Sequence, residues 1–172
     1  MRTERITGHV VLTISDHVDL SDSTAHLHDS LGLRDRTMIE TFYSTGMRRL
    51  ELSQLKLWDI DLERGIVTIR QGKGKKDRMI PLGDRAALWI RKYIEESRPQ
   101  LVSEPDDKIV FLSNAGEPFS LDHLSDLVRD YVDAANIGKR GACHLFRHTM
   151  ATLMLEGGAD SVTFKRCWGT RI

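Results

Sequence analysis

The sequence predicts one α+β domain, mainly α-helical, with a small antiparallel sheet. Three observations lead to this prediction. The chain has 172 residues, which is a usual length for one compact domain. Apolar residues recur at intervals of three and four through most of the chain, as expected for helices that bury one face. Two short alternating segments flank a glycine-rich turn, which is typical of a β-hairpin.

The first ordered element is predicted to be a helix. Residues 1–30 carry five acidic and two basic side chains and many Ser and Asp residues, so we expect a poorly structured segment there. Order is expected to begin near Leu31, followed by a helix over residues 34–44. Its apolar residues at helical spacing are Met38, Ile39, Phe42 and Tyr43. Gly46 suits the left-handed position just past a helix end, and a second, short helix is predicted from about Arg48.

The sheet is predicted next along the chain. Residues 66–69 alternate as a strand does, and residues 78–82 are expected to pair with them across the turn at 71–77. Residues 109–112 form another short apolar segment. We expect this segment to supply the third strand of the sheet.

Three more helices are predicted in the second half of the chain. Asp84 is expected to cap a helix that ends before Pro99, and Ser120 is expected to cap the next. That second helix has a predicted buried stripe of Leu124, Leu127, Val128, Tyr131, Val132 and Ala135. A last helix is expected to begin near His144 and to stop at Gly157–Gly158.

The composition excludes several classes of protein. Lys plus Arg and Asp plus Glu both number 25, so the chain is neither a uniformly basic histone-like protein nor an acidic disordered tail. Two cysteines, Cys143 and Cys167, are too few for a disulfide framework and favour a reducing, cytoplasmic location. No apolar segment is long enough for a membrane helix, and residues 1–5 lack the apolar centre of a signal peptide.

The hairpin carries a concentration of positive charge. Its basic residues are Arg70, Lys73, Lys75, Lys76 and Arg78, and Asp77 is the acidic residue among them. Side chains that project from a hairpin tip could bind the phosphates of duplex DNA. Charge alone does not separate this prediction from the alternative, a soluble turn with ordinary lysines.

Two further motifs point to an anion. His144 and Arg147 lie three residues apart at the start of a helix, so both could face one ligand, with the helix N-terminus adding a favourable dipole. Arg48 and Arg49 follow the predicted glycine turn in a similar position. The alternatives are an ordinary surface pair for the first motif and a helix-capping salt bridge to Glu51 for the second.

The sequence does not predict a zinc site. Its candidate ligands are Cys143, His144, His148 and Cys167. Their spacing matches no standard zinc module, and Cys143 and His144 are adjacent. We therefore expect no metal.

These motifs and their order along the chain resemble those of the tyrosine recombinase (phage integrase) family. The resemblance rests on residues 45–52, Gly72–Gly74 and residues 144–148, supported by 59–61 and 157–160. It covers residues 31–160 and implies the catalytic-domain fold of that family with a three-stranded sheet. It also implies site-specific DNA recombination or integration, in which a phosphotyrosine intermediate joins protein to duplex DNA.

The resemblance implies roles for four residues. Arg48 and Arg147 match the two arginines that hold the scissile phosphate and stabilise its transition state. Lys73 matches the lysine that protonates the leaving 5′ oxygen, and His144 matches the histidine that assists proton transfer. Covalent catalysis through a tyrosine conserves the energy of the phosphodiester bond, so no metal and no nucleotide cofactor is expected.

The two ends of the chain depart from the family pattern. About thirty residues precede the matched region, where family members usually carry a helical domain that closes a clamp around DNA. Residues 161–172 diverge, with Trp168-Gly169-Thr170 where a Leu-Gly-His or Leu-Gly-Trp element is expected. No tyrosine follows Tyr131, and Tyr43 and Tyr93 also lie on predicted apolar helix faces.

We therefore expect a truncated or frameshifted recombinase. It would bind DNA weakly and be inactive alone, because the attacking tyrosine is missing. The alternative is a non-catalytic module that binds or regulates at duplex DNA, as a homo-oligomer or paired with a full-length recombinase.

Overall fold

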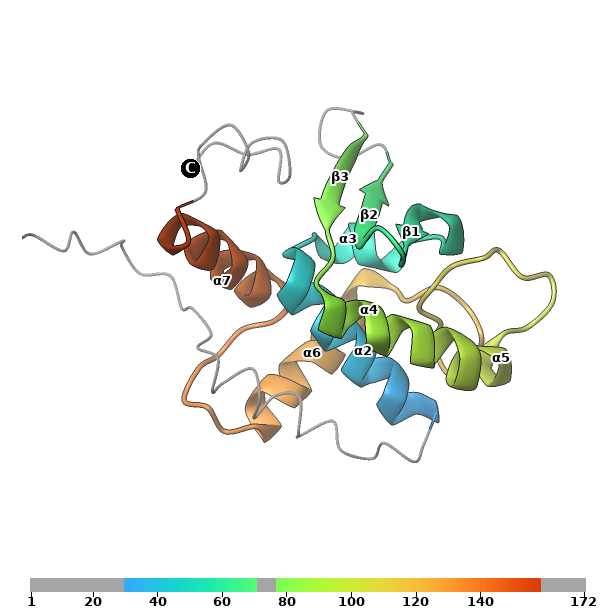
Figure 1. Cartoon of the computed structure of the whole chain (residues 1–172). Helices are drawn as coiled ribbons and strands as arrows, with labels where there is room; N and C mark the ends of the chain where they lie inside the picture. The colour runs from blue at the N-terminus through green and yellow to red at the C-terminus, as the bar shows by residue number, and fades with distance from the viewer. Residues whose placement is uncertain (1–29, 71–76, 159–172) are drawn as a thin grey trace, which may run out of the picture.

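The computed structural model describes residues 30–70 and 77–158 (Figure 1). The α-helices are α2 (Ser30–Thr45), α3 (Arg49–Ser53), α4 (Asp84–Lys92), α5 (Arg98–Leu101), α6 (Leu121–Ala134) and α7 (Cys143–Glu156). The strands are β1 (Ile60–Asp61), β2 (Ile66–Ile69) and β3 (Arg78–Pro81). The mainly helical prediction with a small antiparallel sheet is confirmed. The expectations for residues 1–29, for Lys73, Lys75 and Lys76, and for residues 161–172 lie outside the described residues.

Helix α2 forms the centre of the domain. It packs against α4 and α7, and twelve of its sixteen residues are buried (Figure 1). The ring of Phe42 stacks on that of Phe146 of α7, with centroids 5.9 Å apart, and both side chains are fully buried. Because the helix is enclosed, its charged residues are buried along with its apolar ones.

The buried charges of α2 are paired, as burial requires. The guanidinium group of Arg34 binds the carboxylate of Asp35 at 2.7 Å. One oxygen of Glu40 receives Arg36 Nε at 3.2 Å and Arg85 Nη2, from α4, at 2.8 Å. Two of these ion pairs lie within α2, and the pair between Glu40 and Arg85 connects α2 to α4.

The sheet has the order β1-β2-β3, and both pairings are antiparallel. The predicted hairpin is confirmed, with Val67 opposite Ile80. The predicted third strand is wrong, because β1 holds that place and residues 109–112 form only isolated bridges. The four side chains of residues 109–112 are all buried, so this segment enters the core instead of presenting alternate residues to a sheet.

The helix boundaries were predicted closely, with two corrections. Gly46 has φ of 58° just past α2, and the Ser120 hydroxyl accepts the backbone N–H of His123, so both predicted ends are confirmed. Asp84 is the first residue of α4 and not its cap, which is Gly83. Pro99 lies inside the helical path, because a π-helical turn joins α4 to α5. Proline is tolerated there since the first turn of a helix needs no N–H donor from it.

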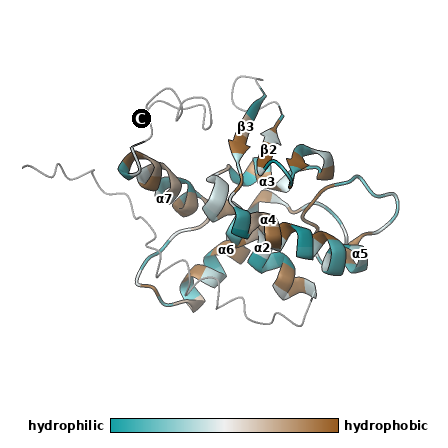
Figure 2. Ribbon diagram, viewed as in Figure 1, coloured by the Kyte–Doolittle hydropathy of each residue, from teal (hydrophilic) through white to brown (hydrophobic). Residues whose placement is uncertain are grey.

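The distribution of hydropathy follows this packing. Figure 2 shows hydrophilic and hydrophobic residues mixed along α4, and a more continuous hydrophobic stretch along α7. Among the described residues, no helix combines the length and the hydropathy needed to cross a bilayer.

Candidate functional site

A cavity of about 270 Å³ lies where the α2–α3 turn meets α6 and α7. We call it the arginine cavity. Its lining residues are Met47, Arg48, Arg49, Ser125, Ala142, Cys143, His144 and Arg147. Three of the four predicted catalytic residues, Arg48, His144 and Arg147, therefore line one space, although they come from motifs about a hundred residues apart. The fourth, Lys73, lies outside the described residues.

Arg48 is positioned by the turn that follows α2. Gly46 takes the left-handed conformation that reverses the chain, and Arg48 then becomes the N-cap of α3. The backbone N–H of Arg48 donates to Glu51 Oε2 at 2.8 Å, and its Nη1 donates to Glu51 Oε1 at 2.9 Å. The capping salt bridge is thus present. It leaves 28% of the Arg48 side chain exposed, so it does not remove Arg48 from the cavity.

Arg147 lies one turn into α7 and reaches back to the same turn. Its Nη1 donates to the carbonyl oxygen of Gly46 at 2.9 Å. Burial lowers the pKa of Arg147 to about 10, repulsion from Arg48 and Arg78 acts in the same direction, and Glu51 opposes both. Arg147 therefore remains protonated near neutral pH, in a place where positive charge is concentrated.

Glu51 is the carboxylate that interacts with Arg48, Arg78 and Arg147. Burial acts to raise its pKa, but hydrogen bonds from Arg78 and Arg48 lower it below its ordinary value, so the carboxylate is ionised. Arg78 Nη2 lies 2.7 Å from Glu51 Oε2, and only 9% of the Arg78 side chain is exposed. The expectation that Arg78 projects into solvent is wrong. Its position two residues from the buried Ile80 on the same strand was a signal that both face inward.

Arg70, the other predicted DNA-binding residue that the structure describes, is placed differently. Its side chain is 56% exposed, and its Nε donates to Asp59 Oδ1. It remains open to solvent at the end of β2. Its contact with DNA stays a prediction, as does that of Lys75 and Lys76.

The other titratable groups of the arginine cavity differ in access. His144 is exposed, and its ring lies edge-on to that of His148, with the two ring centroids 6.3 Å apart. Cys143 is buried, and burial raises the pKa of its thiol to about 11, so it is not a thiolate at neutral pH. Within residues 30–70 and 77–158, no three His, Cys, Asp or Glu side chains gather as metal ligands would.

None of the three tyrosines of the chain lines the arginine cavity. Tyr93 is fully buried against Phe111, and burial raises the pKa of Tyr93 to about 12. The Tyr131 hydroxyl donates to Asp35 Oδ2 at 2.8 Å. Tyr43 is half-buried and lines a different cavity.

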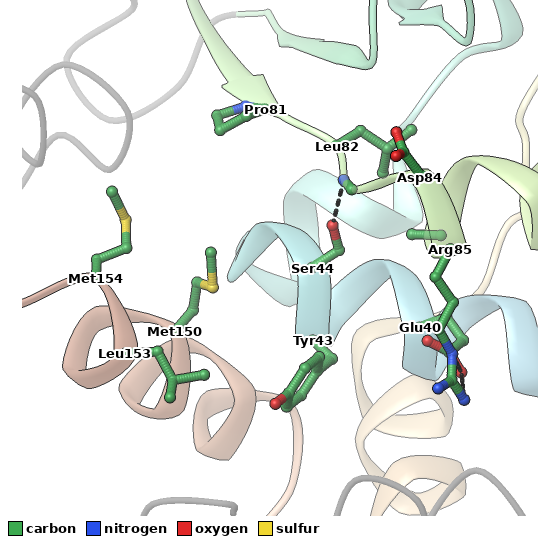
Figure 3. Close-up of a pocket in the computed structure, with 12 residues that line it drawn as sticks. Glu40, Tyr43, Ser44, Pro81, Leu82, Asp84, Arg85, Met150, Leu153 and Met154 are labelled. Carbon is green, nitrogen blue, oxygen red and sulfur yellow. Dashed lines mark hydrogen bonds and ion pairs between the residues drawn. The ribbon is translucent and has the colours of Figure 1, made fainter. Parts of the chain in front are cut away.

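That second cavity has a volume of about 660 Å³ and lies between α2, the start of α4 and the second half of α7 (Figure 3). We call it the apolar cavity. Its apolar lining residues are Pro81, Leu82, Ala86, Met150, Leu153 and Met154. Two pairs of its polar groups are engaged with each other: the Ser44 hydroxyl accepts the backbone N–H of Gly83, and Arg85 binds Glu40 (Figure 3).

Residues 4–169 match the sequence model of the phage integrase family. The tyrosine recombinase XerC 2 of Ralstonia nicotianae is 48% identical over 129 residues, which are 75% of this chain and 37% of that protein. The tyrosine recombinase XerD of Staphylococcus saprophyticus is 41% identical over 150 residues, which are 87% of this chain and 50% of that protein. The chain thus spans half or less of the length of these two relatives.

Solved structures give the same result for the fold. The crystal structure of XerA recombinase superposes with a TM-score of 0.81 at 28% identity, covering 93% of this chain and 56% of that one. The XerH site-specific recombinase, bound to a palindromic difH substrate after cleavage, has a TM-score of 0.78 at 24% identity. That match covers 95% of this chain and 46% of the XerH chain.

Proposed function

The chain belongs to the phage integrase family of tyrosine recombinases, and we propose that it acts in site-specific recombination of duplex DNA by holding the scissile phosphate in the arginine cavity. The observation that carries this proposal is the lining of one cavity by Arg48, His144 and Arg147. Two guanidinium groups and one imidazole match the needs of a phosphodiester that gains charge as it reacts.

Each of these groups has a distinct task. Arg48 and Arg147 donate hydrogen bonds to the non-bridging oxygens and stabilise the extra charge of five-coordinate phosphorus. His144, exposed at the first turn of α7, exchanges a proton with the attacking hydroxyl, as a positioned imidazole can. The role of Lys73 as the acid for the leaving 5′ oxygen rests on the sequence resemblance. No metal or nucleotide cofactor is part of this proposal.

We propose further that the attacking tyrosine is none of Tyr43, Tyr93 and Tyr131. Tyr93 is enclosed in the core, Tyr131 is held by Asp35, and Tyr43 lines the apolar cavity. A second candidate function is a DNA-binding module that works beside a full-length recombinase or a second copy of the chain, since none of these three tyrosines lines the arginine cavity. Because the substrate is DNA and the cysteines are few, the proposed location is the cytoplasm.

The binding half of the proposal is tested with fluorescently labelled duplex DNA. Affinity is expected to be micromolar or weaker, and to fall steeply between about 50 mM and about 200 mM salt, because binding releases counterions from the phosphates. Arg48→Gln with Arg147→Gln should weaken binding about tenfold or more. A matched control removes two charges elsewhere, Arg64→Gln with Arg91→Gln, both from exposed residues. Equal losses in the two double variants would refute the arginine cavity as the phosphate site.

The chemical half is tested with a nicked suicide duplex that carries the recombination site. The 172-residue polypeptide alone should form no covalent adduct, because strand transfer needs a hydroxyl in line with the phosphate. An adduct mapped to Tyr43, Tyr93 or Tyr131 would overturn this expectation. For the second candidate, addition of the polypeptide to a full-length recombinase should change the adduct yield of that partner, and an unchanged yield would eliminate it.

A further inference from the structure

We propose that Arg78 is a positioning residue that keeps Glu51 from neutralising the arginine cavity, and that it thereby sets the affinity of the cavity for a phosphate group. This inference rests on the proposed function. It assigns Arg78 a role different from a direct contact with DNA, since Arg78 does not line the cavity.

The first support is the distribution of hydrogen bonds over the two carboxylate oxygens of Glu51. Oε1 accepts Arg48 Nη1 at 2.9 Å. Oε2 accepts Arg78 Nη2 at 2.7 Å and the backbone N–H of Arg48 at 2.8 Å. The Glu51 and Arg78 side chains are 8% and 9% exposed, so water competes poorly for either group. Arg78 thus occupies an oxygen that would otherwise be available to another cation.

The second support is the charge of the cluster. Arg147 is repelled by Arg48 and Arg78 and attracted by the carboxylate of Glu51. Without Arg78, the Glu51 carboxylate would lose one guanidinium partner. It could then turn toward Arg48 and Arg147 and compete with an incoming phosphate for the same donors, because carboxylates and phosphates bind the guanidinium fork in the same geometry.

The third support is the position of Arg78 in the sheet. It lies on β3, 27 residues beyond Glu51, and β3 pairs with β2 along its whole length. Ile80, on the same face of the strand, is fully buried. Pairing with β2 and burial of Ile80 therefore fix the backbone of β3, and Arg78 extends from this fixed strand to Glu51. A side chain held in this way is suited to fixing the orientation of a carboxylate.

The experiment uses the full 172-residue chain, inorganic phosphate as the probe, and the side-chain N–H signals of Arg48 and Arg147 in NMR as the readout. Arg78→Gln should weaken phosphate binding about fivefold, because the released Glu51 carboxylate would compete with phosphate for the guanidinium donors of Arg48 and Arg147. Arg78→Lys keeps the charge and should remain within about twofold of the wild type. Arg64→Gln removes the same charge from a side chain that is 80% exposed and should have little effect.

A double-mutant cycle separates positioning from direct attraction. In a Glu51→Gln background, Arg78→Gln should change phosphate affinity by less than about twofold, because the carboxylate that Arg78 restrains is gone. An equal loss in both backgrounds would show that Arg78 attracts the anion itself and would overturn the inference. If Arg78→Gln alone fails to fold, a loss of phosphate affinity of more than about twofold between Glu51→Gln and the double variant would still overturn the inference, and a smaller change would support it.

The cycle also distinguishes this inference from the proposed function. Phosphate that shifts the Arg48 and Arg147 signals of the wild type, with no change in Arg78→Gln, would refute the inference and leave the function standing. Phosphate that fails to shift those signals in the wild type would refute the function, and the inference with it.

Discussion

The two cavities are formed in part by the same helix, yet they differ in character. The first half of α7 supplies Cys143, His144 and Arg147 to the arginine cavity, and the second half supplies Met150, Leu153 and Met154 to the apolar cavity. Arg147 and Met150 are only three residues apart. The change from a charged to an apolar lining therefore takes place within about one helical turn.

The contrast shows what makes a cavity suitable for an anion. The apolar cavity is the larger, but its Glu40 carboxylate is paired with Arg36 and Arg85 and its remaining surface is mostly hydrocarbon. The arginine cavity is smaller and is lined by three arginines, Arg48, Arg49 and Arg147. Net charge and donor geometry, more than volume, determine what each cavity can bind.

The largest expected effect comes from removing the support that both cavities share. Phe146→Ala deletes the ring that stacks on Phe42 between α2 and α7, and it should lower the free energy of unfolding by about 3–5 kcal/mol. Urea denaturation measures this change. A loss below about 1 kcal/mol would show that the α2–α7 contact does not depend on this stack.

The next largest effect should appear in one cavity only. Arg147→Gln should weaken binding of duplex DNA about tenfold, because it removes a charged donor to the phosphate. Leu153→Ala, six residues along the same helix in the apolar cavity, should leave DNA affinity within about twofold while lowering stability by about 2 kcal/mol or less, since Leu153 is half-buried. Similar DNA affinities in the two variants would remove the functional distinction between the cavities.

A smaller effect should follow the ionisation of Glu51. Its pKa is lowered in the folded protein, so the unfolded chain binds the proton more readily and stability rises with pH in that range. The stabilisation due to the Glu51 carboxylate should be complete above its ordinary pKa of 4.5 and decline as pH falls below that value. The difference in unfolding free energy between the wild type and Glu51→Gln, measured against pH, tests this. A difference that grows on acidification would contradict the sign.

The smallest effect concerns the apolar cavity alone. Nile red, a neutral dye whose fluorescence rises in apolar surroundings, should bind the native chain, and Met154→Lys should reduce that signal about twofold by placing a charge in the lining. DNA affinity should not decrease in this variant. Dye fluorescence that responds to Arg147→Gln as strongly as to Met154→Lys would show that the two cavities are not independent.

Much of the fold could be predicted because its signals are local. Helical spacing located α2 and α6, the glycine pair 157–158 located the end of α7, and the glycine-rich turn located the hairpin of β2 and β3. Residues 109–112 were assigned wrongly to the sheet, because a short apolar segment has the same sequence pattern whether it joins a sheet or enters the core. The continuation through Pro99 was missed because a proline in the first turn of a following helix resembles one that ends a helix.

The sequence by itself determined which groups could bind a phosphate. Arg48, His144 and Arg147 were identified from short motifs, because turn glycines and helix starts are encoded within a few residues. Only the tertiary structure decided how those groups are arranged and balanced. Arg147 finds its hydrogen-bond acceptor on Gly46, 101 residues away, and Glu51 finds Arg78 across 27 residues. Such contacts depend on how α7 and β3 pack against α2 and α3. The spacing of residues along the sequence does not predict them, because it reports only on local structure.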